Sequence, residues 1–228
     1  MIEIKNLSKR FGPLVVLERV NFIVRDASLV VILGPSGTGK TVLLKSIIGL
    51  LPVDEGEVIF EGKSVQSATR QMMYEIRKKV GYVFQGTALF DSLNVRGNIG
   101  LPIFEHTSLS SKAIGERVTQ VLEIVDMVEK GHLYPQELSG GMKRLVAIAR
   151  ALALDPKYLF YDEPTTGLDP IMTDRVVQLI IDLKKKYGKS SIVVTHDLET
   201  AKAVGDEIYM LKRGQISKLE KVGKELYV

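Results

Sequence analysis

The residues with the clearest chemical meaning form the run GPSGTGKT at positions 34–41. This run matches G-x-x-x-x-G-K-[ST], a phosphate-binding loop whose glycines let backbone N–H groups approach an anion closely. Lys40 would bring a full charge to the β- and γ-phosphates of a nucleotide, and the Thr41 hydroxyl would be a ligand for Mg²⁺. The predicted nucleotide-binding residues of the loop are Gly34, Pro35, Ser36, Gly37, Thr38, Gly39, Lys40 and Thr41.

Two adjacent carboxylates follow an apolar run at positions 158–161. We expect Asp162 to hold Mg²⁺ through water, and Glu163 to accept a proton from, or polarise, an attacking water. Adjacent acids at the end of a strand can also be merely solvated. Beside a phosphate-binding loop, the catalytic interpretation is the stronger one.

Two more polar side chains end apolar runs. Gln85 follows residues 80–84 and could ligate Mg²⁺ through its amide oxygen, and His196 follows residues 191–195 and could contact a γ-phosphate. Either residue alone could lie on an ordinary surface turn. Because the carboxyl ends of parallel strands meet at one edge of a sheet, we expect these side chains near the phosphate loop. The sequence thus predicts catalytic residues Lys40, Glu163 and His196, and metal ligands Thr41, Gln85 and Asp162.

A second candidate anion site lies at LSGGM, positions 138–142. Ser139 is a good N-cap for a helix over 143–154, and two glycines after the cap would leave the helix N-terminus open to an anion. The alternative is a plain capped helix.

The elements that must position these residues follow from the hydrophobic patterns. Residues 29–33 form a β-branched run typical of a buried parallel strand, and the chain from Lys40 to Gly49 has a helical pattern. From residue 86 to about residue 153, strand patterns give way to helical periodicity. The other predicted strands are 2–7, 14–17, 20–24, 56–62 and two within 207–219, and the other predicted helices are 71–79, one capped by Ser110 or Ser111, and 172–187.

The segment from Phe11 to Pro13 is predicted to be a turn between strands. Phe11 could stack on an adenine ring there, although for Phe11 alone an ordinary turn aromatic is the better interpretation. In the segment 86–102, we expect Leu89, Phe90 and Leu93 to help line an exposed apolar patch. The alternative is that these side chains pack into the core of the helical region.

Composition limits the class of protein. The chain has 228 residues with 45% hydrophobic content, and 31 Lys+Arg against 27 Asp+Glu give a net charge of +4. The charges are interspersed, which argues against a nucleic-acid partner. The absence of cysteine excludes disulfides and Cys-based zinc sites, and no apolar run approaches the roughly 18 residues that span a bilayer. We therefore expect a cytoplasmic protein that reaches a membrane only through a partner.

Taken together, the motifs resemble the ATPase subunits of ABC transporters over essentially the whole chain. Leu138 to Gly141 match the ABC signature, which in this family meets the ATP of a partner subunit through the residues matching Ser139, Gly140, Gly141 and Met142. By position, Phe11 matches the aromatic that stacks on adenine, Gln85 the Q-loop glutamine, Asp169 the D-loop aspartate of dimer communication, and His196 the switch histidine.

The resemblance implies an α/β fold: a RecA-like P-loop NTPase core with an antiparallel β subdomain and an inserted α-helical subdomain. It implies one ABC ATPase domain over 1–228, with core and β subdomain in 1–85 and 154–228 and the helical subdomain in 86–153. It further implies ATP and Mg²⁺ as cofactors, a homodimer on ATP binding, integral membrane permease subunits as partners, and a peripheral position on the cytoplasmic face of the inner membrane.

A narrower resemblance is to the ATPases of Mla/MCE-type phospholipid-transport systems, carried by residues 37–45, 82–93 and 135–144. Leu145 departs from the arginine of that group. This resemblance implies ATP-driven phospholipid transport between membranes and a lipid-binding MCE-type protein in the full system. The alternatives are an amino-acid importer or a lipoprotein exporter, and less favourably a non-transport ABC ATPase acting on nucleic acid, which would insert long coiled coils or a zinc module.

Overall fold

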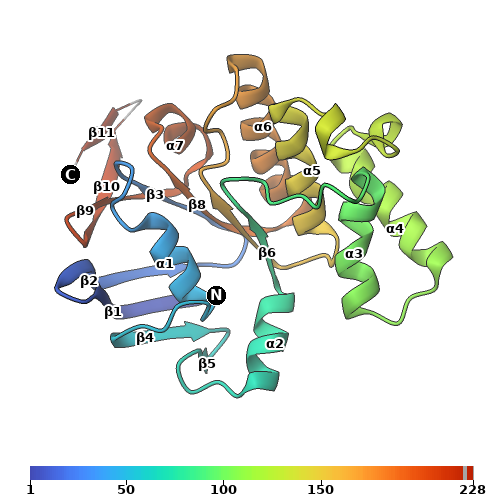
Figure 1. Ribbon diagram of the computed structural model, residues 1–228. Coiled ribbons are helices and arrows are strands. Elements are labelled where there is room, and N and C mark those ends of the chain that lie inside the picture. The colour runs from blue at the N-terminus through green and yellow to red at the C-terminus, as the bar shows by residue number, and fades with distance from the viewer. Residues whose placement is uncertain (223–224, 228) are drawn as a thin grey trace.

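A seven-stranded sheet runs through the centre of the molecule in the order β11-β10-β9-β3-β8-β7-β6 (Figure 1). The structure is a computed structural model and describes residues 1–222 and 225–227. The strands from β9 to β6 pair in parallel, and β10 and β11 continue the sheet antiparallel. The strands are β3 Leu29–Leu33, β6 Val80–Val83, β7 Tyr158–Asp162, β8 Ser190–Thr195, β9 Glu207–Lys212, β10 Gln215–Val222 and β11 Glu225–Tyr227.

A four-stranded antiparallel sheet, in the order β2-β1-β4-β5, forms the second layer. Its strands are β1 Ile2–Phe11, β2 Leu14–Val24, β4 Glu55–Phe60 and β5 Lys63–Ser64. The prediction of two strands within 14–24 is wrong. Arg19 adopts a left-handed φ of 47° between Leu17 and Val20, where the pairing with β1 shifts register, so a bulge replaces the expected break and the strand continues.

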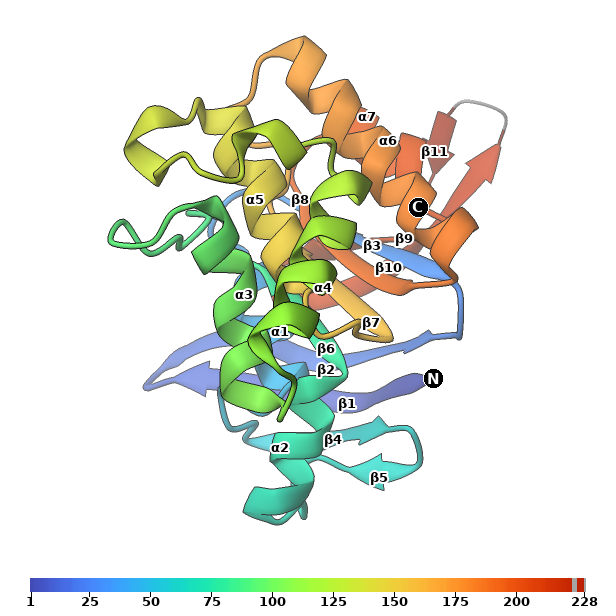
Figure 2. The ribbon, with the colours of Figure 1, turned by 90° about the vertical axis from the view of Figure 1, so that its right-hand side faces the viewer.

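The chain between β6 and β7 is helical, and its helices α3, α4 and α5 lie side by side (Figure 2). Ser110 caps α4 and Ser139 caps α5 by accepting hydrogen bonds from Ala113 N and Met142 N. The helices are α1 Lys40–Ile47, α2 Arg70–Lys78, α3 Val95–His106, α4 Ser111–Ile124, α5 Gly140–Leu152, α6 Pro170–Tyr187 and α7 Leu198–Val204, with 3₁₀ turns at Val128–Lys130 and Pro135–Glu137.

The central sheet separates two hydrophobic cores, because successive residues of its buried strands point to opposite faces. In β3, Val30 and Ile32 face the core shared with α1 and the four-stranded sheet. Leu29, Val31 and Leu33 face the core shared with α3 to α7. Both faces of the sheet are thus covered, which leaves the ends of its strands and its edges to form sites.

A charge network ties the antiparallel sheet to the central one. Lys157, just before β7, lies 2.9 Å from Glu61, just after β4, and 2.9 Å from Asp26. Hydrogen bonds from Lys79 and then Lys157 lower the pKa of Glu61 to about 2, and hydrogen bonds from the amino group of Met1 and then Lys157 lower that of Asp26 to about 2.

Removing the central cation should weaken this network in a pH-dependent way. Both carboxylates have a lower pKa folded than unfolded, where values are about 4, so their stabilisation is present above about pH 4 and is lost as the pH falls toward 2. We expect Lys157→Met to lower the melting temperature at pH 7 by about 2–4 °C, as for about 1 kcal/mol in a chain of this size. The difference should shrink steadily in melts at lower pH; a difference independent of pH would contradict this account.

In the part of the chain that the structure describes, no helix is both long enough and apolar enough to cross a membrane.

Candidate functional site

The predicted phosphate loop lines a cavity of about 340 Å³ at the carboxyl edge of the central sheet. Phe11 reaches this cavity from the last position of β1, Gln85 from just after β6 and Glu163 from just after β7. The structure thereby brings together residues 11, 85 and 163 with the loop. The remaining lining residues are Val16, Ser36, Gly37, Gly39, Lys40, Thr41 and Val42.

The loop joins β3 to α1, as its sequence pattern indicates. Gly39 has a φ of 99°, and a Cβ there would lie 2.6 Å from a methyl group of Val16, so only glycine fits. Gly39 is the N-cap of α1, and no side chain caps this helix. The free N–H groups at the start of α1 are therefore available to an anion.

Lys40 is buried and makes contacts within the loop that carries it. Its Nζ donates to the carbonyl oxygens of Gly34 and Pro35 at 2.7 and 2.9 Å, and lies 3.1 Å from Oε1 of Glu163. A phosphate that enters the cavity would replace these partners with its own oxygens.

Glu163 is the centre of the polar contacts. Besides Lys40, its carboxylate contacts Nδ1 of His196 at 2.8 Å and accepts a hydrogen bond from the Thr166 hydroxyl at 3.0 Å. Burial raises the pKa of Glu163, but the hydrogen bond and charge of Lys40, with Thr166 and His196, outweigh burial, so the net shift is downward. Glu163 is therefore a carboxylate at neutral pH, as a proton acceptor must be.

Asp162 lies beside the loop threonine. Its Oδ1 accepts a hydrogen bond from the Thr41 hydroxyl at 2.9 Å, and its Oδ2 accepts one from the Tyr82 hydroxyl at 3.2 Å. Burial raises the pKa of Asp162 although both hydrogen bonds lower it. A buried carboxylate whose charge is not fully compensated, next to a hydroxyl, fits the oxygen donors that Mg²⁺ prefers.

Sequence reasoning missed two arginines of α5. Arg144 donates to the carbonyl oxygens of Phe84 and Gln85, both at 2.8 Å. Arg150 donates to those of Thr87 and Ala88 at 2.8 and 2.6 Å. Leu145, where the resemblance leads one to expect an arginine, is fully buried, and the arginine that contacts Phe84 and Gln85 is at the preceding position.

The signature residues and Asp169 lie away from the cavity around Lys40. Ser139 is exposed at the start of α5, Gly141 packs against Met172 of α6, and Asp169 caps α6 by accepting from Met172 N at 3.0 Å. Among the described residues that line the cavity, none comes from 139–142 or is Asp169. One chain thus presents two separate candidate phosphate sites.

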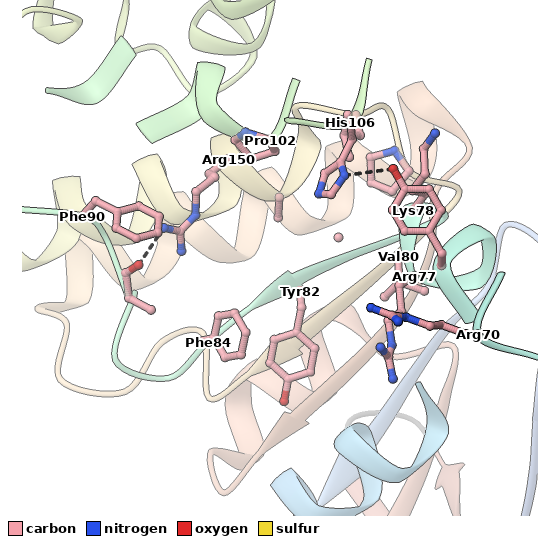
Figure 3. A pocket seen from close by; sticks show the side chains of 16 residues that line it. Arg70, Arg77, Lys78, Val80, Tyr82, Phe84, Phe90, Pro102, His106 and Arg150 are labelled. Atoms are coloured by element: carbon pink, nitrogen blue, oxygen red, sulfur yellow. Dashed lines mark hydrogen bonds between the residues drawn. The ribbon is translucent and has the colours of Figure 1, made fainter. Parts of the chain in front are cut away.

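A larger groove of about 660 Å³ lies between α2, β6, α3 and α5 (Figure 3). Phe90, half exposed, lines it, as expected for an apolar patch. The expectation is wrong for Leu89, which is partly buried against the core, and Leu93 also lies outside the groove lining. The cations of the groove are Arg70, Arg77, Lys78 and Arg150.

Comparison with known proteins places these features in a family. The ABC transporter family matches residues 17–166. The chain is 41% identical to the intermembrane phospholipid transport system ATP-binding protein MlaF of Haemophilus influenzae, covering 92% of this chain and 80% of that protein. It is 41% identical to the methionine import ATP-binding protein MetN of Clostridium acetobutylicum, covering 95% and 67%.

Two further similarities bear on the site. The chain is 39% identical to the probable ribonucleotide transport ATP-binding protein mkl of Mycobacterium leprae over 93% of this chain, but it spans only 61% of that protein. The dimeric structure of MJ0796, a bacterial ABC transporter cassette, superposes with a TM-score of 0.88 at 33% identity, covering 97% of this chain and 100% of that one. A post-hydrolysis state of the same cassette, bound to ADP and Pi, superposes with a TM-score of 0.87.

The predicted ABC ATPase fold is confirmed by these structures, and ATP with Mg²⁺ as cofactors by the family. The chain belongs to the ABC transporter family, as one of its ATP-binding and ATP-hydrolysing proteins.

Proposed function

We propose that two copies of this chain bind ATP between them and use its hydrolysis to drive a membrane permease that moves phospholipid between membranes. The observation that carries the dimer is the separation of the two phosphate sites: Ser139 lies outside the cavity that holds Lys40. A head-to-tail pair would place the α5 N-terminus of one copy against the nucleotide held by the other. The dimeric state of MJ0796 supports this arrangement.

Each site residue then has a distinct task. Lys40 binds the phosphates, Glu163 accepts the proton of the attacking water, and His196, held by its Nδ1 contact to Glu163, presents its other ring nitrogen toward the γ-phosphate. Thr41, Asp162 and Gln85 would hold Mg²⁺, which neutralises phosphate charge when bound. Phe11, 47% exposed at the cavity, would stack on adenine.

We also assign the predicted subdomains. The helices between β6 and β7 support a helical subdomain over 86–153, and the sheets support a core with a β subdomain in 1–85 and 154–228. Of the last range, residues 223, 224 and 228 lie outside the described residues.

The phospholipid assignment rests on the similarity to MlaF together with the Mla/MCE-like motifs. It implies an MCE-type lipid-binding protein in the full system and a peripheral position on the cytoplasmic face of the inner membrane. The similarity to MetN favours a second candidate, an amino-acid importer. To separate the two, the chain is purified with its permease, the bound lipid is identified, and transfer of lipid between vesicles is assayed. The ATPase activity is also measured with each candidate substrate. Stimulation by methionine rather than by phospholipid would favour the importer.

We propose that a helix of the permease docks in the groove beside Phe90. The rings of Phe84 and Phe90 are 37% and 50% exposed, and both line the groove, so a docked apolar helix would remove them from water. The groove lies next to Gln85, which allows docking to affect the nucleotide site.

Phe90→Ala tests this assignment. We expect at least a tenfold loss of permease association in a pull-down, because truncating an aromatic anchor of an interface costs about 2 kcal/mol or more. The melting temperature should change little, since the ring is half exposed. Phe104→Ala is the matched control: Phe104 is 67% exposed on α3 but outside the groove lining, so association should persist. A large fall in melting temperature would instead place Phe90 in the core.

A further inference from the structure

Tyr82 belongs to both the groove and the nucleotide site. Its ring lines the groove, and its hydroxyl donates to Oδ2 of Asp162 at 3.2 Å. The other oxygen of the same carboxylate accepts from Thr41. Each oxygen of Asp162 is thus held by one hydroxyl, and one of these hydroxyls comes from a groove residue.

Phe84 extends this contact toward solvent. Residues 82 and 84 lie on the same face of the chain at the end of β6, and the two rings pack with centroids 4.4 Å apart and planes at 35° (Figure 3). The Phe84 ring is partly exposed in the groove, whereas the Phe84 carbonyl is fixed by Arg144. The side chain of Phe84 is therefore free to respond to a groove occupant while its backbone stays in place.

We propose that Tyr82 is a positioning residue that orients the Asp162 carboxylate for Mg²⁺, and that Phe84 relays occupancy of the groove to this carboxylate through Tyr82. The relay, but not the orienting role, rests on the function proposed for the groove. At 3.2 Å the hydrogen bond is longer than the usual O–H···O range of about 2.5–3.0 Å, so a further displacement of the ring by a few tenths of an ångström suffices to break it.

The hydroxyl rather than the ring is what the orienting role requires. Phenylalanine at position 82 would keep the ring in the groove and its packing against Phe84, but would leave Oδ2 of Asp162 without this donor. A hydrogen bond to a charged group affects binding by about tenfold or more, and a neutral one by about twofold to tenfold, so a bond as long as this one should contribute about threefold to tenfold.

The test measures metal-dependent binding rather than turnover. The dissociation constant of the non-hydrolysable analogue AMP-PNP is determined by calorimetry with Mg²⁺ and with EDTA, and the ratio of the two is the Mg²⁺ gain. Tyr82→Phe should reduce the Mg²⁺ gain about threefold to tenfold while the metal-free constant stays unchanged. An Mg²⁺ gain equal to that of the wild type, or an equal loss with and without metal, would overturn the orienting role.

Tyr74→Phe is the matched control. Tyr74 lines the same groove, but its hydroxyl contacts His106 at 3.1 Å and not Asp162, so this variant should keep the full Mg²⁺ gain. If Tyr74→Phe reduces the gain as much as Tyr82→Phe does, the effect belongs to the groove in general and the proposal fails.

The relay is tested by combining variants. Phe84→Ala should lower the Mg²⁺ gain when Tyr82 is present, and should have no further effect in the Tyr82→Phe chain, because both changes act through one hydroxyl. Additive losses would overturn the relay. All these measurements use the isolated chain, so failure of permease docking in the Phe90→Ala experiment would leave their outcome unaffected.

Discussion

Glu163→Gln is expected to reduce ATP hydrolysis by about 10²–10⁴-fold while ATP binding persists, as for loss of a positioned general base. The amide keeps the shape of the side chain but cannot accept a proton. It also ends the ion pair of 3.1 Å with Lys40, so the lysine is freed for phosphate and the affinity for ATP should not fall. The stalled protein should accumulate as an ATP-bound dimer.

Gel filtration with ATP and Mg²⁺, together with single-turnover hydrolysis, measures both effects. Glu199→Gln serves as the control, because Glu199 is exposed on α7 and contacts Lys202 rather than the cavity. A Glu163→Gln chain that hydrolyses ATP at the wild-type rate, or that stays monomeric with ATP, contradicts the assigned role.

Ser139→Asp is expected to abolish turnover while each single chain still binds ATP. Aspartate is as good an N-cap as serine, so the hydrogen bond to Met142 N and the start of α5 should be retained. The new carboxylate would face the γ-phosphate held by the partner and repel it. Gly141→Asp is a poorer choice, since a Cβ there would lie 2.6 Å from the Met172 side chain and would disturb packing within one chain.

Mixing variants shows whether the site is shared between two chains. A one-to-one mixture of Ser139→Asp and Lys40→Ala chains, each inactive alone, should regain activity, because a heterodimer has one site with both lesions and one with neither. If chains pair at random and one intact site suffices, about a quarter of wild-type activity should return, given the twofold arrangement. A mixture as inactive as its components would refute the shared site.

The position of the site follows from the sequence, since parallel strands end at one edge of a sheet. Gln85, the adjacent pair Asp162 and Glu163, and His196 each follow an apolar run, and the structure places these runs as the neighbouring strands β6, β7 and β8. The type of the elements was predictable for the same reason: buried strands and capped helices have strong local signals.

The contacts within the site did not follow from the sequence. The Lys40–Glu163 ion pair joins residues 123 positions apart, and the Tyr82–Asp162 hydrogen bond depends on two strands being neighbours in the sheet. The continuous strand β2 was missed because a bulge at Arg19 has no marker such as glycine. Arg144 and Arg150 resemble ordinary helix-surface cations until the fold brings residues 84–88 against α5.

Four hydrogen bonds from Arg144 and Arg150 join residues 84–88 to α5, so the two segments should move together. The 13 residues of α5 form a rod about 20 Å long, with the groove near one end and Ser139 at the other. If a docked helix displaces this loop, the hydrogen bonds would pass the displacement to α5 and so move Ser139 at its N-terminus. In the proposed dimer, a displacement at one chain's groove would thus reach the nucleotide held by its neighbour.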